Sequence, residues 1–420
     1  MSQLPFLVDQ RAKFKGRAVT HALLIGVSHY DHASSLDAGA HTAVRIYEWL
    51  KSADEAGALP APLATATLLL SPTNSERTIV EEQIGKTGWA PATGSNILDA
   101  QERLFQLTLE MEADLKKPDL EIGAGLAFYY FGGHGADFFR DDPIGFASDF
   151  DDAKLPWAGA FDHLEFRERL TRIDDERSVA ASERARCLIF YDCCRTRDDE
   201  ASFGSAIHLN YKPVLDQPAG VRPFHVLSAA TESFAAWEPS ESINLPPHYD
   251  LPLSFFGHAL LNAIQWSQDY SSNSQFPWHT SATGLLEDVA RAMKELAKHD
   301  SLGEPLPGAP SLKLGPPDFP VVRSKLPPKV TVSLSCDPEN GRHSKTIEID
   351  ERAGIAYQRR HTLPPWTGHP DSLTCVPGLF RIEARCPKGS LQKDITLRPA
   401  LTVWEWIVRD DDITVHDPAD

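Results

Sequence analysis

Two short segments of the sequence carry the side chains best suited to chemistry. Residues 127–138 (AFYYFGGHGADF) run from an aromatic stretch into His134, and residues 187–200 (CLIFYDCCRTRDDE) run from a second apolar stretch into Cys194. A free thiol has a pKa of about 8.5, so an imidazole beside it can serve as the base that forms the thiolate. The two segments therefore predict nucleophilic thiol catalysis, provided that the fold brings them together.

The glycines around the histidine have a physical role in such a site. They let a substrate backbone approach closely, and the N–H groups of Gly135 and Cys194 could together stabilise an oxyanion. Each half alone has a simpler interpretation: Gly-Gly-His-Gly suits a tight turn or a phosphate loop, and a single cysteine is usually an inert core residue. The occurrence of both, each after an apolar run, favours catalysis.

The apolar runs indicate the elements that must position this chemistry. Each has strand length and is apolar on both alternating faces, as central strands of a largely parallel sheet are. These runs cover residues 18–27, 66–70, 126–131, 187–191 and 224–229. Amphipathic stretches separate them or follow, at residues 43–52, 96–107, 161–173, 255–265 and 284–298. We expect an α/β fold whose sheet is flanked by helices, with the functional groups at the carboxyl ends of its strands.

A change of pattern predicts a second domain. Eight of the 32 prolines fall between Pro305 and Pro328, a density that neither a helix nor a central strand tolerates. Beyond them the sequence alternates with period two, as in half-buried strands. We therefore expect a first domain over residues 1–323, a linker at 324–329 and a small Ig-like β-sandwich over 330–420.

Composition narrows the function classes. The net charge of −18 opposes binding to nucleic acid or anionic lipid. No window approaches the 18 apolar residues of a membrane span, and the amino terminus does not resemble an export signal. None of the six cysteines forms a C-x-x-C pair, which argues against a zinc site. These features predict a cytoplasmic protein that binds neither nucleic acid nor membrane.

The motifs resemble those of caspase-fold cysteine peptidases of the bacterial metacaspase type. The histidine motif matches YYFGGHG (129–135), and the aspartate-x-cysteine motif matches FYDCCR (190–195). Further resemblance lies in HALLIGVSHY (21–30), PATGSNILDAQERL (91–104), LSAATESFAAWEP (227–239), LSFFGHALLNAI (253–264) and PSLKLGPPDFPVV (310–322). Caspases carry glutamine two residues before the cysteine. Here that residue is Asp192, so the sequence is closer to the metacaspases, and the resemblance covers roughly residues 18–323.

This resemblance implies a caspase-like fold, with Cys194 as nucleophile and His134 as acid/base. It also implies cleavage after Arg or Lys, with Asp192 in the pocket for the cationic side chain. Two other pocket positions depart from the family: Thr42 stands where aspartate is usual, and Gly132 where serine is usual. The pocket is therefore expected to be wider and less acidic. Asp192 could instead cap a strand end, and Trp237, expected to contact substrate, could instead pack in the core.

The resemblance also implies regulation. Metacaspases are often activated by Ca²⁺, for which Asp149, Glu165 and Asp199 are the candidate ligands, although acidic runs of this kind are commonly solvated surface. The thiol chemistry itself requires no cofactor. The segment 196–222 corresponds to a loop that relatives cleave in themselves, with Arg195, Arg197 and Lys212 as conceivable sites, and it could equally be an uncut surface loop.

The expected partners are protein substrates and an upstream activating protease or sensor, in a bacterial stress or antiphage setting. The alternative is a catalytically silent scaffold that binds partners through its β-sandwich. It is disfavoured because both His134 and Cys194 are present. A nucleotide-binding domain is also disfavoured, because the sequence has neither G-x-G-x-x-G nor G-x-x-x-x-G-K-[ST] after its first predicted strand.

Overall fold

A computed structural model gives the three-dimensional structure. It describes residues 4–119, 121–136, 142–151, 153–154, 158–173, 183–194, 220–230, 253–264, 269–270, 278–299, 310–315, 318–324, 330–337, 346–353, 356–363, 371–375, 378–386, 389–397, 403–409 and 414–415. The backbone divides into two compact units. The first comprises residues 1–264 and 280–323, and the second comprises residues 265–279 and 324–420.

An eight-stranded sheet forms the centre of the first unit, in the order β1-β3-β2-β5-β10-β12-β15, with β4 paired to β3. Strands β2, β3, β5, β10 and β12 are mutually parallel, whereas β1 and β15 pair antiparallel at the edges. The strands are β1 (Val8–Asp9), β2 (Val19–Val27), β3 (Leu63–Ser71), β4 (Trp89–Pro91), β5 (Gly125–Gly132), β10 (Arg186–Asp192), β12 (Phe224–Ser228) and β15 (Ser311–Gly315). The prediction of a largely parallel sheet is confirmed, and all five predicted strands lie in it.

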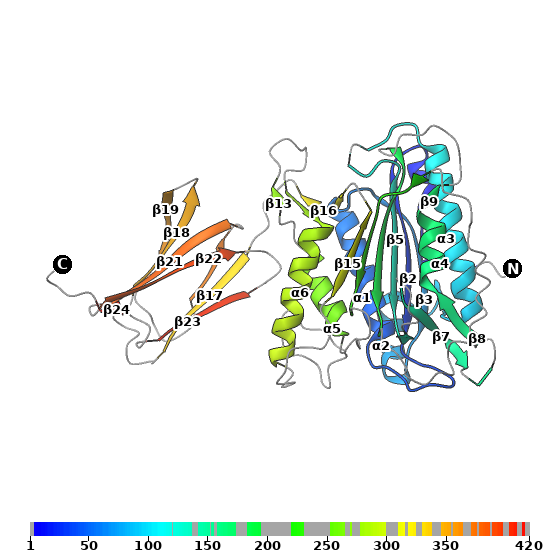
Figure 1. Ribbon diagram of the computed structural model, residues 1–420, viewed down its shortest axis with the longest axis horizontal. Helices are drawn as coiled ribbons and strands as arrows, with labels where there is room; N and C mark the ends of the chain where they lie inside the picture. Colours follow the sequence, from blue (N-terminus) through cyan, green and yellow to red (C-terminus); the bar gives the residue numbers. More distant parts are fainter. Residues whose placement is uncertain are drawn as a thin grey trace. The chain divides into compact units, whose positions relative to one another are not determined.

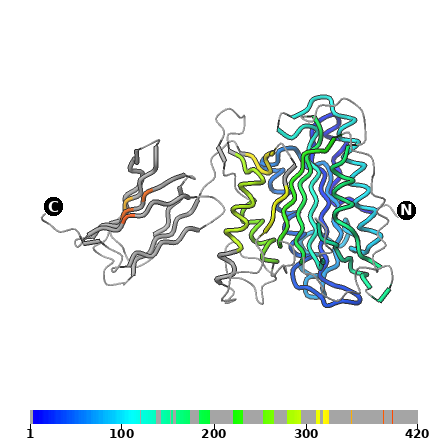
Figure 2. Tube along the Cα trace, viewed as in Figure 1, coloured from blue at the N-terminus to red at the C-terminus, as the bar shows by residue number. Residues whose placement is uncertain are grey.

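Helices cover both faces of this sheet, which explains why β2, β3, β5 and β10 are buried along their whole length. As Figure 1 shows, α1, α5 and α6 lie on one side, and α3 and α4 on the other. The helices are α1 (Gly39–Glu55), α2 (Asn74–Ile84), α3 (Gly94–Asp114), α4 (His163–Thr171), α5 (Phe255–Ile264) and α6 (Ala282–His299), with a 3-10 helix at Arg11–Phe14. Figure 2 follows the same elements along the Cα trace.

Helix α2 was not among the predicted elements, although its start carries a clear signal. The Thr73 side chain accepts from the backbone of Glu76, and the Glu76 side chain accepts from the backbone of Thr73, which is a capping box. The helix was missed because few of its residues are apolar: only Glu76 and Val80 are buried.

The first unit also contains short strands outside the large sheet. They are β6 (Gly135–Ala136), β7 (Ile144–Asp151), β8 (Ala158–Asp162), β9 (Arg172–Ile173), β11 (Gly220–Val221) and β16 (Pro320–Ser324). Strands β6, β7 and β8 form an antiparallel sheet directly after the histidine motif. Within the proline-rich segment, β15 lies at the edge of the large sheet, where a strand tolerates neighbouring prolines.

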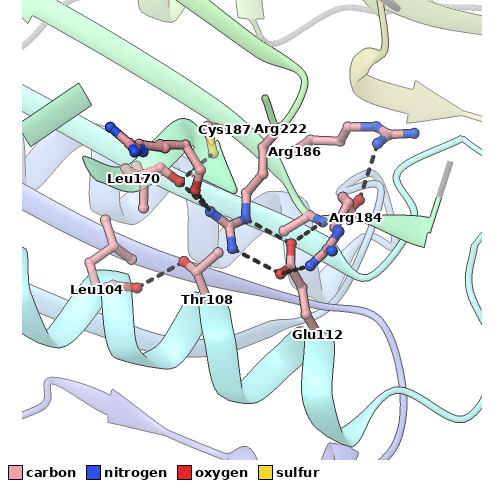
Figure 3. Close-up of polar contacts among 10 residues, drawn as sticks. Leu104, Thr108, Glu112, Leu170, Arg184, Arg186, Cys187 and Arg222 are labelled. Atoms are coloured by element: carbon pink, nitrogen blue, oxygen red, sulfur yellow. Dashed lines mark hydrogen bonds and ion pairs between the residues drawn. The ribbon is translucent and has the colours of Figure 1, made fainter. Parts of the chain in front are cut away.

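A buried ionic network closes the amino end of the sheet (Figure 3). Arg222, which is 1% exposed, donates to both carboxylate oxygens of Glu112 on α3, at 2.8 and 2.9 Å. It also donates to the main-chain oxygens of Leu170 and Arg172, at 3.0 and 2.8 Å. The Glu112 carboxylate accepts further bonds from Ala185 N–H and the guanidinium of Arg184. The Arg222 side chain thus connects the segment before β12 with α3 and with the end of α4.

The described residues of the second unit form strands. Three of them make one sheet in the order β20-β17-β23, and five make another in the order β19-β18-β21-β22-β24. They are β17 (Val330–Asp337), β18 (Thr346–Ala353), β19 (Ala356–Leu363), β20 (Asp371–Cys375), β21 (Gly378–Cys386), β22 (Gly389–Leu397), β23 (Val403–Arg409) and β24 (Thr414–Val415), with a pair β13 (Asp269–Tyr270) and β14 (Trp278–Ser281) earlier in the chain. The alternating pattern thus forms two sheets.

Candidate active site

The histidine and cysteine motifs leave the sheet side by side. Strands β5 and β10 are parallel neighbours whose last pair is Gly132 with Asp192, and Gly133 N–H donates to the Asp192 main-chain oxygen at 3.1 Å. His134 follows Gly132 by two residues, and Cys194 follows Asp192 by two. The chain brings the two motifs to the same edge of the sheet, as we predicted from the ends of the apolar runs.

Gly135 of the histidine motif packs closely against both cysteines of the other motif. A Cβ atom at Gly135 would lie 2.9 Å from the Cys193 Sγ and 3.0 Å from the main-chain oxygen of Cys194. Contacts that short are repulsive, so only glycine fits here. Gly135 is buried and begins β6, which pairs with β7. Its proposed part in an oxyanion hole stays a prediction.

The two adjacent cysteines have different surroundings. Cys193 is 2% exposed and belongs to the hydrophobic core cluster that contains Tyr129 and Tyr191. Cys194 is partly exposed, and neither cysteine is part of a disulfide bond. Successive residues at a strand end point to opposite sides, so one thiol is directed into the core and the next toward the surface. Of the two, Cys194 is the one a substrate could reach.

The loop between β2 and α1 holds the His134 side chain. The ring Nε2 lies 2.8 Å from the main-chain oxygen of Ser34, and the main-chain N–H of His134 donates to the Tyr30 hydroxyl at 2.6 Å. The Tyr30 ring packs against the imidazole, with 4.7 Å between ring centroids. A carbonyl only accepts, so Nε2 carries the proton of the neutral ring and Nδ1 is the basic nitrogen. Burial lowers the pKa of His134, which keeps the ring neutral and able to accept a proton.

Asp192 lies beneath this edge as a buried carboxylate. Its Oδ2 accepts hydrogen bonds from the Tyr130 hydroxyl, at 2.7 Å, and from the Ser254 hydroxyl. Burial raises the pKa of Asp192 to about 6, although both hydrogen bonds oppose that shift. Gly132 makes the Tyr130 contact possible, because a Cβ there would lie 2.6 Å from the Tyr130 hydroxyl.

Thr42 is linked to Asp192 through Ser254. The Ser254 N–H donates to the Thr42 hydroxyl oxygen at 3.4 Å, while the Ser254 hydroxyl donates to Asp192. Thr42 is fully buried on α1, and a Cβ at Gly257 would lie 2.3 Å from its methyl group. The side chain at this position therefore faces tightly packed protein of α5, and the threonine is part of the support of Asp192.

Two of the three predicted calcium ligands have other surroundings. Asp149 accepts from Gly94 N–H at 2.8 Å at the start of α3, and Glu165 is exposed in the first turn of α4. Within the described ranges no group of three or more His, Cys, Asp or Glu side chains is placed to hold a metal ion. Asp199 lies outside the described residues, so the calcium site stays a prediction.

Other predicted residues also fall outside the described residues: Trp237 and the suggested cleavage positions Arg195, Arg197 and Lys212. The segment 196–222 is described only from residue 220 onward. Its last residue, Arg222, is buried in the Glu112 network, so its side chain is not available to a pocket for basic residues.

Four residues of the site were not assigned from sequence: Tyr30, Ser34, Tyr130 and Ser254. Tyr30 and Tyr130 stand inside the motif segments, and Ser254 stands inside a segment that resembles the family. Ser34 contributes a main-chain oxygen, for which no side-chain pattern exists.

Comparison with known proteins adds the following. No protein-family model and no curated protein matches the chain. Among solved structures it is similar to one described as the structure of pro-sf-caspase-1, with a TM-score of 0.34 and 9% identity over 71% of this chain and 92% of that chain. In the described part of the chain, no helix has the length and apolar character needed to cross a membrane.

Proposed function

We propose that this chain is a caspase-like cysteine endopeptidase in which Cys194 is the nucleophile and His134 the acid/base. The observation that supports it most directly is the placement of an oriented imidazole and a partly exposed thiol at the ends of two adjacent parallel strands. The Tyr30 ring packs against the imidazole, and the Ser34 main-chain oxygen accepts from Nε2, so Nδ1 is the nitrogen able to take a proton.

The reaction follows from these groups. His134 Nδ1 takes the proton of the Cys194 thiol, and the thiolate adds to the carbonyl carbon of the scissile peptide. The C–N bond breaks as the imidazolium returns the proton to the leaving amine, which leaves a thioester on Cys194. His134 then takes a proton from water, the resulting hydroxide adds to the thioester carbonyl, and the thiolate departs and is reprotonated.

Asp192 is the residue that we propose selects Arg or Lys before the cleaved bond. It is a carboxylate buried within two residues of the nucleophile, and a cationic substrate side chain would neutralise a charge that is costly to bury alone. We further propose a cytoplasmic enzyme that acts on protein substrates without a cofactor in its chemistry. Its activation by cleavage, ligand or Ca²⁺ in bacterial stress or antiphage defence, and its separation into domains at 324–329, belong to the same proposal.

Fluorogenic peptides ending in Arg, Lys or Asp, with and without Ca²⁺, provide the test. The variants are Cys194→Ala, His134→Ala and, as matched control, Cys193→Ala. We expect release from Arg and Lys peptides by the parent and by Cys193→Ala, and a loss of at least ~10³-fold in the other two.

A thiol-reactive peptide probe ending in Arg extends the test if every protein is silent with peptides. Labelling of Cys194 that requires His134 indicates a competent site that awaits activation. Absence of both turnover and labelling would favour the silent scaffold that binds partners through its β-strands.

A further inference from the structure

Glu76 is a buried carboxylate whose two oxygens serve different elements. Oε2 accepts from the N–H and the hydroxyl of Thr73, at 2.9 and 3.1 Å, which caps α2. Oε1 is directed away from the helix and accepts from the Ser28 hydroxyl at 3.0 Å and from His41 N–H at 3.2 Å. Capping explains the first oxygen only. The second joins α2 to the loop between β2 and α1.

Ser28 closes the base of that loop, which we call the histidine loop (residues 28–38). Its hydroxyl accepts from Ala40 N–H at 2.8 Å, and its main-chain oxygen accepts from Leu36 N–H at 2.8 Å. Its own N–H donates to Ser71 at the end of β3, at 2.9 Å. Both ends of the loop therefore converge on Ser28, and Ser28 in turn donates to Glu76.

The histidine loop carries both groups that hold His134. The Tyr30 hydroxyl accepts from the main-chain N–H of His134, and the Ser34 main-chain oxygen accepts from Nε2 of the ring. A third contact, Asp31 N–H to the Ser148 oxygen at 2.9 Å, fixes the loop to β7. The orientation of the imidazole thus depends on where this loop lies, and the loop base depends on the carboxylate of Glu76.

We propose that Glu76 is a positioning residue for His134 and acts through the histidine loop. This inference rests on the proposed function, because it assigns Glu76 to the orientation of the imidazole that activates Cys194. Glu76 touches no reacting atom. Without its carboxylate, the buried Ser28 hydroxyl and His41 N–H lose their acceptor, and the loop base is free to shift.

The test is the rate at which iodoacetamide alkylates Cys194, because it reports thiolate formation without any substrate. The sulfur forms a bond to the CH₂ carbon as the C–I bond breaks, and mass spectrometry of the peptide that contains Cys194 follows the product. Glu76→Ala and Ser28→Ala remove the loop contact, and Thr73→Ala weakens the cap of α2 while leaving Oε1 in place. Glu76→Gln keeps one oxygen able to accept from Ser28 and His41.

We expect alkylation to slow by about tenfold in Glu76→Ala and Ser28→Ala, because small displacements of an activating group reduce rates by one to two orders of magnitude. Thr73→Ala should stay within about twofold of the parent, because its loss concerns helix stability. Glu76→Gln should recover most of the rate. Thermal unfolding of each variant confirms that the measured protein is folded.

Three outcomes would overturn the inference. Parental alkylation rates in Glu76→Ala and Ser28→Ala, with a slow rate in His134→Ala, would refute the positioning role of Glu76 and leave the proposed function intact. Equal slowing in Thr73→Ala and Glu76→Ala would assign the effect to helix capping. A parental rate in His134→Ala would refute the activating imidazole, and both proposals would fall together. If Glu76→Ala does not fold, Ser28→Ala decides, because it leaves α2 unchanged.

Discussion

The Nε2 atom of His134 lies 2.8 Å from the main-chain oxygen of Ser34. The acceptor is a backbone group, so no side-chain substitution at position 34 removes it. It also fixes which ring nitrogen carries the proton, since the carbonyl has none to give. A base made in this way needs no third side chain to set its tautomer.

The pKa of His134 should lie below the ordinary value of 6.5, because burial disfavours the charged ring. In Cys194→Ala protein, NMR titration of the ring should show a midpoint below 6.5 and a proton on Nε2 in the neutral form. The same ring in urea-unfolded protein is the control and should titrate near its ordinary value. A folded midpoint at or above 6.5, or a proton on Nδ1, would contradict this description.

Asp192→Asn should stabilise the protein while it removes the preference for basic residues. Burial raises the folded-state pKa of Asp192 to about 6, so ionisation costs stability above that pH. The gain, on the order of 2–3 kcal/mol, should be present above pH 6 and fade as pH falls toward the ordinary value of 3.8, where the carboxyl is protonated in both states.

Urea unfolding of parent and Asp192→Asn between pH 4 and 8 measures that difference. Ser254→Ala is a useful companion, because it removes a hydrogen bond that lowers the pKa of Asp192 and should move the transition to higher pH. A stability difference that does not vary with pH would refute the assignment.

Glu112→Gln should destabilise the fold by about 3–5 kcal/mol, because it leaves Arg222 buried without its counter-charge. Burial opposes ionisation of Glu112, but hydrogen bonds from Arg222 outweigh it and hold the pKa below its ordinary value of 4.5. That stabilisation is complete above pH 4.5 and is lost as pH falls through the depressed pKa. The difference between parent and variant should therefore shrink in acid.

The exposed pair Arg11–Asp9, with 44% and 39% of the side chains accessible, is the matched control. Asp9→Asn should cost less than about 1 kcal/mol. Equal effects at the two pairs, measured by urea unfolding at pH 7, would show that the Glu112 network adds nothing beyond a surface ion pair.

Gly257→Ala should impair the site by displacing Thr42 and Ser254 from beneath Asp192. The added methyl carbon would lie 2.3 Å from the Thr42 methyl and 2.7 Å from the Ser254 hydroxyl. Overpacking of this kind typically costs about 1–3 kcal/mol. Thr42→Ser removes the first clash and keeps the oxygen that accepts from Ser254, so Gly257→Ala/Thr42→Ser should recover part of the lost stability. The absence of any recovery would contradict the contact.

The central sheet could be predicted because its strands are buried on both faces and stand out as continuous apolar runs. The meeting of the two motifs followed from one further rule, that parallel strands end at the same edge. The support of the site followed no such rule. Thr42 and Ser254 meet across 212 positions of sequence, and Asp149 and Gly94 across 55. Contacts of that range depend on how helices and loops pack, which a single sequence does not encode locally.

The same limit explains why Asp149 was considered as a calcium ligand. An acidic residue in a loop has the same appearance in sequence whether it binds a cation or caps a helix start. Only the position of the α3 N-terminus distinguishes the two.

Because Cys193 is buried beside an accessible Cys194, the number of alkylated cysteines distinguishes folded from unfolded molecules. Digestion after Arg186 and Arg195 yields one fragment with three thiols, at positions 187, 193 and 194, of which the first two are buried in the folded chain. A brief exposure to a small alkylating reagent should add a single mass increment to this fragment, and prior denaturation should add three. The proportion of singly modified fragment would then give the folded fraction of any preparation, independent of knowing a substrate.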